Sequence, residues 1–554
     1  FFPFFFLMIK RFFSSCSPTR PMTSPLVKLV WLITYSHAKM LTAEQQLCLQ
    51  LARGAEKLAE NGDHRGAVRG LVSALKCGLP PAIASVAAYN LGLSLSTFDA
   101  SADAATAFGK AAILALEKDR KAEAYGKRGD SLARIAQWSE AGEAYGHATL
   151  YSDDPRYSLN AAAAFINANS DRALYFLENV SEDSRDSLYY AHLTTAYSIQ
   201  SNNELATIAL NQISLNLTSL LFAAMLLESK ANDKHLAIHA LERIVFSDQN
   251  LLTHDDPHTS SVLYRLSRLY TAFAREHDVA YIRELAYTKG IWLHPFQQPG
   301  YVVPALRKLH VSTIKPWIST SSNDTSCTNE FDQVWQPLLR LKSRLENELF
   351  SIARQEWQHI SAQQAFSPDD EGIAIDPEAW HQFIFRRNGK WLPELNNTFP
   401  RTVALLHDIL DNSPEEYALH LPKGSAQISI LRPGATLVPH CGPSNHRIRF
   451  HLTLESDGSA SITVGDPSDP NNTHYHQPGV VFIFDDSFLH SAQIPFEASY
   501  PRVVILIDVW HPALSRADRD SVRKHFLYDP NDTFGWRTTH SPFGPTTLGL
   551  AIPH

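Results

Sequence analysis

The feature that most restricts the fold of this chain is an internal repeat of 37 residues in its first half. Gly92 in one copy corresponds to Gly129 in the next, and Phe108 corresponds to Tyr145. Small residues let two antiparallel helices approach closely, and an aromatic side chain fills the space beside them. The period and the residue types therefore predict helix pairs that stack along one axis.

Apolar residues keep helical spacing from about residue 41 to 285, in a region rich in Ala and Leu. The repeat length is close to that of tetratricopeptide repeats, so we expect an α-solenoid of about six helix pairs. Such solenoids commonly present a concave surface that binds peptides. A purely structural arm and a dimerisation device are the alternative interpretations of the same repeats.

The sequence changes character after residue 285. Residues 286–345 combine a Pro-containing linker with a connecting helix, and residues 346–530 contain six or more short β-rich runs separated by turn residues. In one of these runs Arg447, Arg449 and His451 alternate with apolar residues, so the two sets lie on opposite faces of a strand. The spacing predicts an antiparallel jelly roll or small barrel.

Composition excludes some classes of protein. The formal net charge is -8 and no long Lys/Arg run occurs, which disfavours nucleic acid as a partner. The five cysteines include no CxxC pair, so neither a disulfide framework nor a structural zinc site is expected. We expect residues 1–40 to be disordered or a wrongly assigned start, because their apolar runs are too short to span a membrane. Residues 531–554 are expected to form a C-terminal tail.

Two histidines follow β-rich runs in the last quarter of the chain, His440 and His490. Strand ends converge at one mouth of a small barrel, so two imidazoles that are distant in sequence can meet there. Such a pair is typical of a non-haem iron site. Arg449 and Arg502 would place positive charge inside the barrel, where a buried guanidinium needs an anionic partner such as a dicarboxylate.

Other residues near the two histidines are less suitable as ligands. Cys441 should point away from the histidine that precedes it, because neighbours on a strand face opposite sides. Asp485 and Asp486 are expected to have a turn and strand-end role for the same reason. His474 and His476 lie in a loop without other ligand types, and we expect both to be solvated.

Three segments closely resemble the aspartyl/asparaginyl β-hydroxylase family over about residues 425–514: ISILRPGATLVPHCGPSNHRIRFHLTL, GVVFIFDDSFLHSA and RVVILIDVWHPAL. Members of that family use Fe(II), 2-oxoglutarate and dioxygen to hydroxylate the β-carbon of Asp or Asn residues, and many carry tetratricopeptide repeats before the oxygenase. The resemblance implies a tetratricopeptide-like α-solenoid followed by a double-stranded β-helix (jelly-roll or cupin-like) oxygenase domain.

The resemblance also implies roles for individual residues. His440 and His490 match the two iron ligands, and Arg502 matches the catalytic-site arginine that holds the distal carboxylate of 2-oxoglutarate. Gly442 stands where many related oxygenases have an acidic third ligand, a departure that the family shares. Further groups of the cosubstrate pocket are matched by Ser429, Arg449 and His451.

Two other functions are compatible with the sequence. The chain could be a scaffold whose solenoid binds a partner and whose barrel is inactive, or a cupin-like metalloenzyme that does not use 2-oxoglutarate. For the hydroxylase we expect a protein or peptide substrate, bound in part by the helical repeats. The cytoplasm is the favoured location, and the endoplasmic reticulum membrane or lumen, where animal members act, is the alternative.

Overall fold

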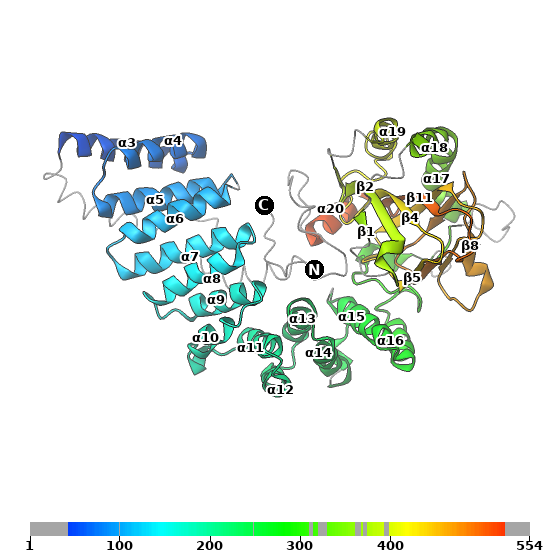
Figure 1. Cartoon of the computed structure of the whole chain (residues 1–554), viewed down its shortest axis with the longest axis horizontal. Coiled ribbons are helices and arrows are strands. Elements are labelled where there is room, and N and C mark those ends of the chain that lie inside the picture. Colours follow the sequence, from blue (N-terminus) through cyan, green and yellow to red (C-terminus); the bar gives the residue numbers. More distant parts are fainter. Residues whose placement is uncertain are drawn as a thin grey trace.

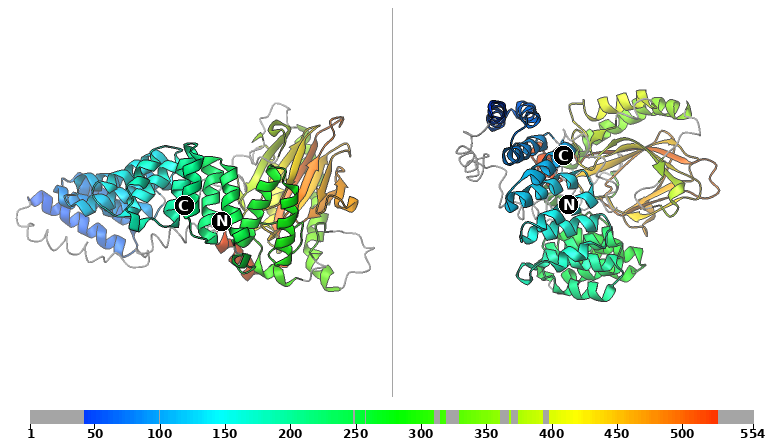
Figure 2. Two further views of the ribbon diagram at one scale, coloured as in Figure 1. Left: turned by 90° about the horizontal axis from the view of Figure 1, so that it is seen from below. Right: turned by 60° about the vertical axis from the view of Figure 1, so that its left-hand side comes forward.

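The chain forms an arm of stacked helices that leads into a domain built on two β-sheets (Figures 1 and 2). Residues 1–40 and 531–554, expected to be an extension and a tail, lie outside the described residues. None of the helices within the described part is both long and apolar enough to cross a membrane. The computed structural model describes residues 42–526 except 99, 248, 257, 310–313, 319–328, 360–366, 369–373 and 393–397.

The helical arm consists of seven antiparallel helix pairs within the described residues. Successive pairs stack in chain order, so the predicted tetratricopeptide-like solenoid is confirmed. The repeat length predicted about six pairs. The structure has one more within the described residues, because some later pairs are shorter than 37 residues. The helices are α3 (Ala43–Glu60), α4 (His64–Lys76), α5 (Pro81–Ser96), α6 (Ser101–Leu114), α7 (Lys118–Arg134), α8 (Trp138–Thr149), α9 (Pro155–Asn167), α10 (Ala173–Glu178), α11 (Ser187–Ile199), α12 (Asn203–Gln212), α13 (Leu217–Leu226), α14 (Lys234–Ser247), α15 (Thr259–Ala272) and α16 (Glu276–Thr288).

The repeated glycine and aromatic positions are in contact. A Cβ atom on Gly92 would lie 2.7 Å from Cε1 of Phe108, and a Cβ atom on Gly129 would lie 2.6 Å from Cε1 of Tyr145. A glycine inside a helix costs roughly 0.5–1 kcal/mol relative to alanine. The close approach of the two helices, with the aromatic ring seated over the glycine, offsets that cost in each repeat.

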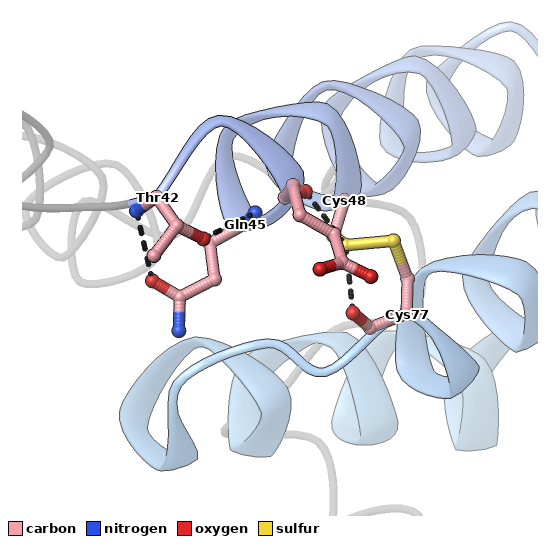
Figure 3. The surroundings of a disulfide bond; sticks show 5 residues. Thr42, Gln45, Cys48 and Cys77 are labelled. Carbon is pink, nitrogen blue, oxygen red and sulfur yellow. Dashed lines mark hydrogen bonds between the residues drawn. A yellow bond between two sulfur atoms is a disulfide. The ribbon is translucent and has the colours of Figure 1, made fainter.

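A disulfide joins Cys48 of α3 to Cys77 at the end of α4, with the two Cα atoms 5.6 Å apart (Figure 3). The expectation that the chain lacks disulfides is wrong for this pair. The two cysteines are 29 residues apart, and only the packing of α3 against α4 brings them together. Thr42 caps α3 in a reciprocal capping box with Gln45. The capping box and the disulfide together stabilise the first turns of this helix.

The C-terminal domain contains a large and a small antiparallel sheet. The large sheet has the order β1-β2-β4-β11-β6-β9 with β3 paired to β2, and the small sheet has the order β5-β10-β7-β8. The predicted jelly roll is therefore confirmed. The strands are β1 (Ser367–Pro368), β2 (Trp380–Arg387), β3 (Lys390–Trp391), β4 (Ala426–Leu431), β5 (Thr436–His440), β6 (Arg447–Glu455), β7 (Ser461–Val464), β8 (Thr473–Tyr475), β9 (Val481–Phe484), β10 (His490–Gln493) and β11 (Arg502–Trp510).

Helices cover the outer face of the large sheet. Ile448, Phe450 and Leu452 of β6 are buried in one core with apolar side chains of these helices, such as Leu341 and Leu406. This core is the main hydrophobic cluster of the domain. Because it buries one face of β6 under the helices, the other face of β6 points toward the small sheet. The covering helices are α17 (Asn329–Arg344), a π-helical turn (Leu345–Leu349), α18 (Phe350–His359) and α19 (Pro400–Leu410).

The inner face of the large sheet looks toward the small sheet. Trp380 of β2 shares a buried cluster with Leu437 of β5 and Ala492 of β10, so side chains from the two sheets meet between them. Arg449 and His451 alternate with the outer-face residues of β6 and therefore point to this inner face. The alternation that the sequence predicted places charged and polar groups inside the barrel.

Candidate active site

His440 and His490 face each other across the small sheet. His440 is the last residue of β5 and His490 the first of β10, and the two are direct partners in the antiparallel register. Their ring centroids lie 4.1 Å apart. The structure thus brings together two histidines that are fifty residues apart, as the strand-end argument predicted.

Backbone carbonyls orient both imidazoles. Nδ1 of His440 lies 2.7 Å from the carbonyl oxygen of Val438, and Nδ1 of His490 lies 2.8 Å from that of Phe488. Burial holds the pKa of His490 well below its ordinary value, so this ring is neutral. An Nδ1–H that donates to a carbonyl leaves the lone pair on Nε2, which is the arrangement found in metal-binding histidines. The donor pair therefore fits a divalent metal ion.

Gly442 is where an acidic third ligand would stand. A Cβ atom there would lie 2.5 Å from Oδ2 of Asp486, and the backbone N–H of Gly442 donates to the Asp486 carbonyl at 2.6 Å. The Asp486 carboxylate therefore occupies the space of a side chain at position 442. Within the described residues, no cluster of three or more His, Cys, Asp or Glu side chains could hold a metal ion.

Two arginines and two aspartates form a closed network beside this glycine. Arg447 contacts Asp486 at 2.6 Å and Asp508 at 3.2 Å, and Arg449 contacts the same two carboxylates at 3.2 Å and 2.8 Å. Burial opposes ionisation of Asp486, but the two guanidinium groups hold its pKa below the usual value. We call these four residues the paired cluster. Asp486 neutralises the arginines, an ion-pairing role that the expected turn and strand-end role did not include.

Arg502 lies at the opposite end of strand β11 from Asp508 and has a different environment. It is 2% exposed, and its Nη2 donates to Oγ of Ser429 at 2.8 Å. Trp380 donates to the same hydroxyl oxygen at 2.9 Å. Within the described residues, Arg502 has no carboxylate partner and its Nε has no hydrogen bond. Burial lowers the pKa of Arg502 to about 10, so it remains charged at neutral pH.

His451 borders Arg502 on the inner face. Both of its ring nitrogens are buried and have no hydrogen-bond partner in the part of the chain that the structure describes. Burial, and after it the charge of Arg502, hold the pKa of His451 well below its ordinary value. A neutral imidazole with two unused nitrogens next to a lone guanidinium is characteristic of a binding pocket rather than of a packed core.

His476 corrects the expectation that both loop histidines are solvated. It is fully buried, with its ring centroid 5.9 Å from that of His451. The chain turns inward directly after β8, which the loop-like sequence did not reveal. His474 is half-buried and packs on Trp317 at 4.1 Å.

The remaining candidates, Cys441 and Asp485, are both buried. The Cys441 thiol is buried, and burial raises its pKa so far that it stays protonated. Asp485 accepts hydrogen bonds from Gln297 at 2.9 Å and from the Ser487 hydroxyl at 2.6 Å, and burial raises its pKa to about 7. Gln297 belongs to the segment after α16, so this contact joins the helical arm to the loop that precedes His490.

The fold and the site define a jelly-roll domain with two converging histidines and a buried arginine. Residues 342–512 match the family model described as "Aspartyl/Asparaginyl beta-hydroxylase". The chain is 34% identical over 152 residues to "Aspartate beta-hydroxylase domain-containing protein 2" of Mus musculus, covering 27% of this chain and 41% of that protein. It is 33% identical over 159 residues to "Aspartyl/asparaginyl beta-hydroxylase" of Homo sapiens, covering 28% and 19%. Its sheet domain is similar to the aspartyl/asparaginyl β-hydroxylase family over these residues, as the sequence segments indicated.

The similarity to these relatives is confined to one part of each protein. The alignments span less than half the length of the curated relatives. Among solved structures, a tetratricopeptide repeat protein from Parabacteroides merdae covers 44% of this chain and 94% of its own, with 12% identity and a TM-score of 0.30.

Proposed function

We propose that this chain is an Fe(II)- and 2-oxoglutarate-dependent dioxygenase that hydroxylates the β-carbon of Asp or Asn residues in a peptide or protein. The observation that supports this best is Arg502, a buried cation without a carboxylate partner among the described residues. Burying an unpaired charge is costly. A dicarboxylate that binds the guanidinium through two hydrogen bonds would remove the cost.

Each residue of the site has a task in this proposal. His440 and His490 would hold Fe(II) through their Nε2 atoms, and the metal with dioxygen supplies the oxidising chemistry when bound. Arg502 and Ser429 would bind the distal carboxylate of 2-oxoglutarate, with His451 beside it. Neither imidazole contributes charge, so the cosubstrate must balance the charge of the metal. Binding of metal and of 2-oxoglutarate should therefore be coupled.

Arg449 has a less direct place in the proposed pocket. Its guanidinium already contacts Asp486 and Asp508, so its charge is largely neutralised within the chain. Its assignment to the cosubstrate pocket stays a prediction. It contacts Asp486, whose carboxylate lies beside Gly442, and would in this way help to maintain a two-histidine metal site.

We also propose that the helical arm helps to hold the substrate. The segment that follows α16 hydrogen-bonds to both loops that carry the histidines: Tyr301 N–H donates to Pro443 O at 3.1 Å, and Gln298 N–H donates to Ser487 O at 2.9 Å. A peptide bound on the last helix pairs would therefore be tethered close to the site. This contact favours a substrate-binding role over a detached structural arm.

The proposed reaction is tested by incubating the full chain with Fe(II), 2-oxoglutarate and a library of Asp- and Asn-containing peptides. We expect succinate, and one added oxygen atom on Asp or Asn in tandem mass spectrometry. His440→Ala and His490→Ala should abolish both, whereas the half-buried His474→Ala should not. Absence of turnover together with absence of metal binding would favour the scaffold. Activity that survives Arg502→Ala would favour a metalloenzyme that does not use 2-oxoglutarate.

A further inference from the structure

His476 is a buried histidine in the pocket that none of the roles described above uses. Its ring lies nearly parallel to that of His451, with an interplanar angle of 23° and centroids 5.9 Å apart. Phe482 packs on it at 5.1 Å. His476 follows strand β8 of the small sheet, whereas His451 belongs to the large sheet, so the two imidazoles approach the same part of the inner face from opposite sheets.

The hydroxyl of Thr453 determines which ring nitrogen of His476 carries the proton. Oγ1 of Thr453 lies 3.1 Å from Nδ1 of His476, and this is its one side-chain hydrogen bond within the described residues. If Nδ1 donated, the threonine hydrogen would be buried without an acceptor. If the hydroxyl donates to Nδ1, the proton sits on Nε2 and a single group remains unsatisfied. We therefore assign the Nε2–H tautomer.

The Nε2–H group is then left without a hydrogen-bond partner among the described residues. Nε2 is buried and makes no hydrogen bond to any described residue. Burial, followed by the charge of Arg502, holds the pKa of His476 well below its ordinary value, so the ring is neutral. A neutral N–H donor next to a fixed guanidinium complements a carboxylate and repels a cation. Leaving such a donor buried and unsatisfied destabilises the protein, and a bound anion would remove that cost.

We infer that His476 is a further cosubstrate-binding residue, which donates a hydrogen bond from Nε2 to the carboxylate that Arg502 holds. This inference rests on the proposed function, because it takes 2-oxoglutarate as the anion. Thr453 acts through His476 and is a positioning residue: it orients the ring and sets its tautomer.

The test compares two histidines that differ by two positions. His476→Phe keeps a ring in the pocket but removes the donor, and His474→Phe makes the same change outside it. The first readout is the thermal shift that 2-oxoglutarate causes in the Mn(II)-loaded, non-reacting protein. We expect the concentration for a half-maximal shift to rise at least tenfold in His476→Phe and to stay unchanged in His474→Phe. In the Fe(II) enzyme KM for 2-oxoglutarate should rise likewise, with kcat changed less than threefold.

Two further variants separate hydrogen bonding from packing. His476→Gln offers an amide N–H and should recover part of the affinity, and Thr453→Val should weaken binding because it frees the tautomer. If His476→Phe does not fold, the 2-oxoglutarate affinity of these two variants tests whether the hydrogen bond from His476 contributes to binding. A normal 2-oxoglutarate response in all His476 and Thr453 variants, with the response lost in Arg502→Met, would overturn this inference alone. No response of the unmodified protein would instead contradict the proposed function.

Discussion

Two groups of buried charge lie on the inner face of the same sheet, and they differ in what neutralises them. In the paired cluster, Arg447 and Arg449 are each within 3.2 Å of both Asp486 and Asp508. At the far end of β11, Arg502 contacts a serine hydroxyl and no carboxylate among the described residues. His451 and His476 beside it carry further unpaired nitrogens.

This difference distinguishes charges that stabilise the fold from a charge that is suited to bind a ligand. A charge network that is complete within the chain holds strands together and stabilises the fold as long as all its members are present. A buried charge that has no counter-ion in the chain lowers stability unless a bound ligand of opposite charge pairs with it. The paired cluster is therefore complete within the chain, and the unpaired end is where an anion would bind under the proposed function.

The largest effect is expected from breaking the paired cluster. Asp508→Ala leaves two buried guanidinium groups with one carboxylate, and we expect the free energy of unfolding to fall by about 3–5 kcal/mol. Urea denaturation followed by circular dichroism measures this change. Asp520→Ala is the control, because Asp520 pairs with Arg523 on the surface of α20 (Arg516–His525) and should change stability by less than about 0.5 kcal/mol. An equal fall in the free energy of unfolding of the two variants would contradict the claim that a buried ion pair matters more than an exposed one.

A smaller effect is expected where the paired cluster meets the proposed metal site. Gly442→Ala places a methyl group 2.5 Å from Oδ2 of Asp486, and overpacking of this kind costs about 1–3 kcal/mol. Gly54→Ala on α3 is the matched control: a Cβ there has no neighbour within 4 Å. The Gly54→Ala substitution should stabilise the helix by about 0.5–1 kcal/mol. A stabilising Gly442→Ala would show that Asp486 moves freely.

The unpaired end should respond in the opposite way to loss of its charge. Arg502→Met removes a buried cation that has no counter-ion, so the ligand-free protein should lose less than about 1 kcal/mol or gain stability. Arg449→Met, which leaves buried carboxylates short of a partner, should be clearly less stable than the unmodified chain. Thermal unfolding of both variants without 2-oxoglutarate makes the comparison. A large loss in Arg502→Met would show that the chain itself neutralises this arginine.

Local sequence signals predicted much of this architecture. The alternation in residues 447–455 correctly assigned Arg449 and His451 to the inner face, since a strand has a period of two. The repeat placed Gly92 against Phe108, because helix pairs of equal length pack alike. The meeting of His440 with His490 was also expected from local pattern, although His490 begins strand β10 and only His440 ends a strand.

The failures concern contacts that only the tertiary structure creates. His476 follows a three-residue strand and has polar neighbours, so nothing local distinguishes it from a solvated loop residue. Cys48 and Cys77 meet because α3 packs on the end of α4, and no spacing rule encodes that contact. Likewise, the pairing of Arg449 with Asp508 depends on strand order, since β6 and β11 are neighbours in the sheet but not in the sequence.

The smallest effect tests the electrostatics of the unpaired end directly. Burial and the charge of Arg502 both lower the pKa of His476, so Arg502→Met should raise that pKa while burial still keeps it below the ordinary value. His192 in α11 is the internal control, because burial alone lowers its pKa to about 4 and it lies in the helical arm. Imidazole NMR titration of both residues measures the shift. If the pKa of His476 did not change while the variant stayed folded, Arg502 would be too distant from His476 for the two to share one carboxylate.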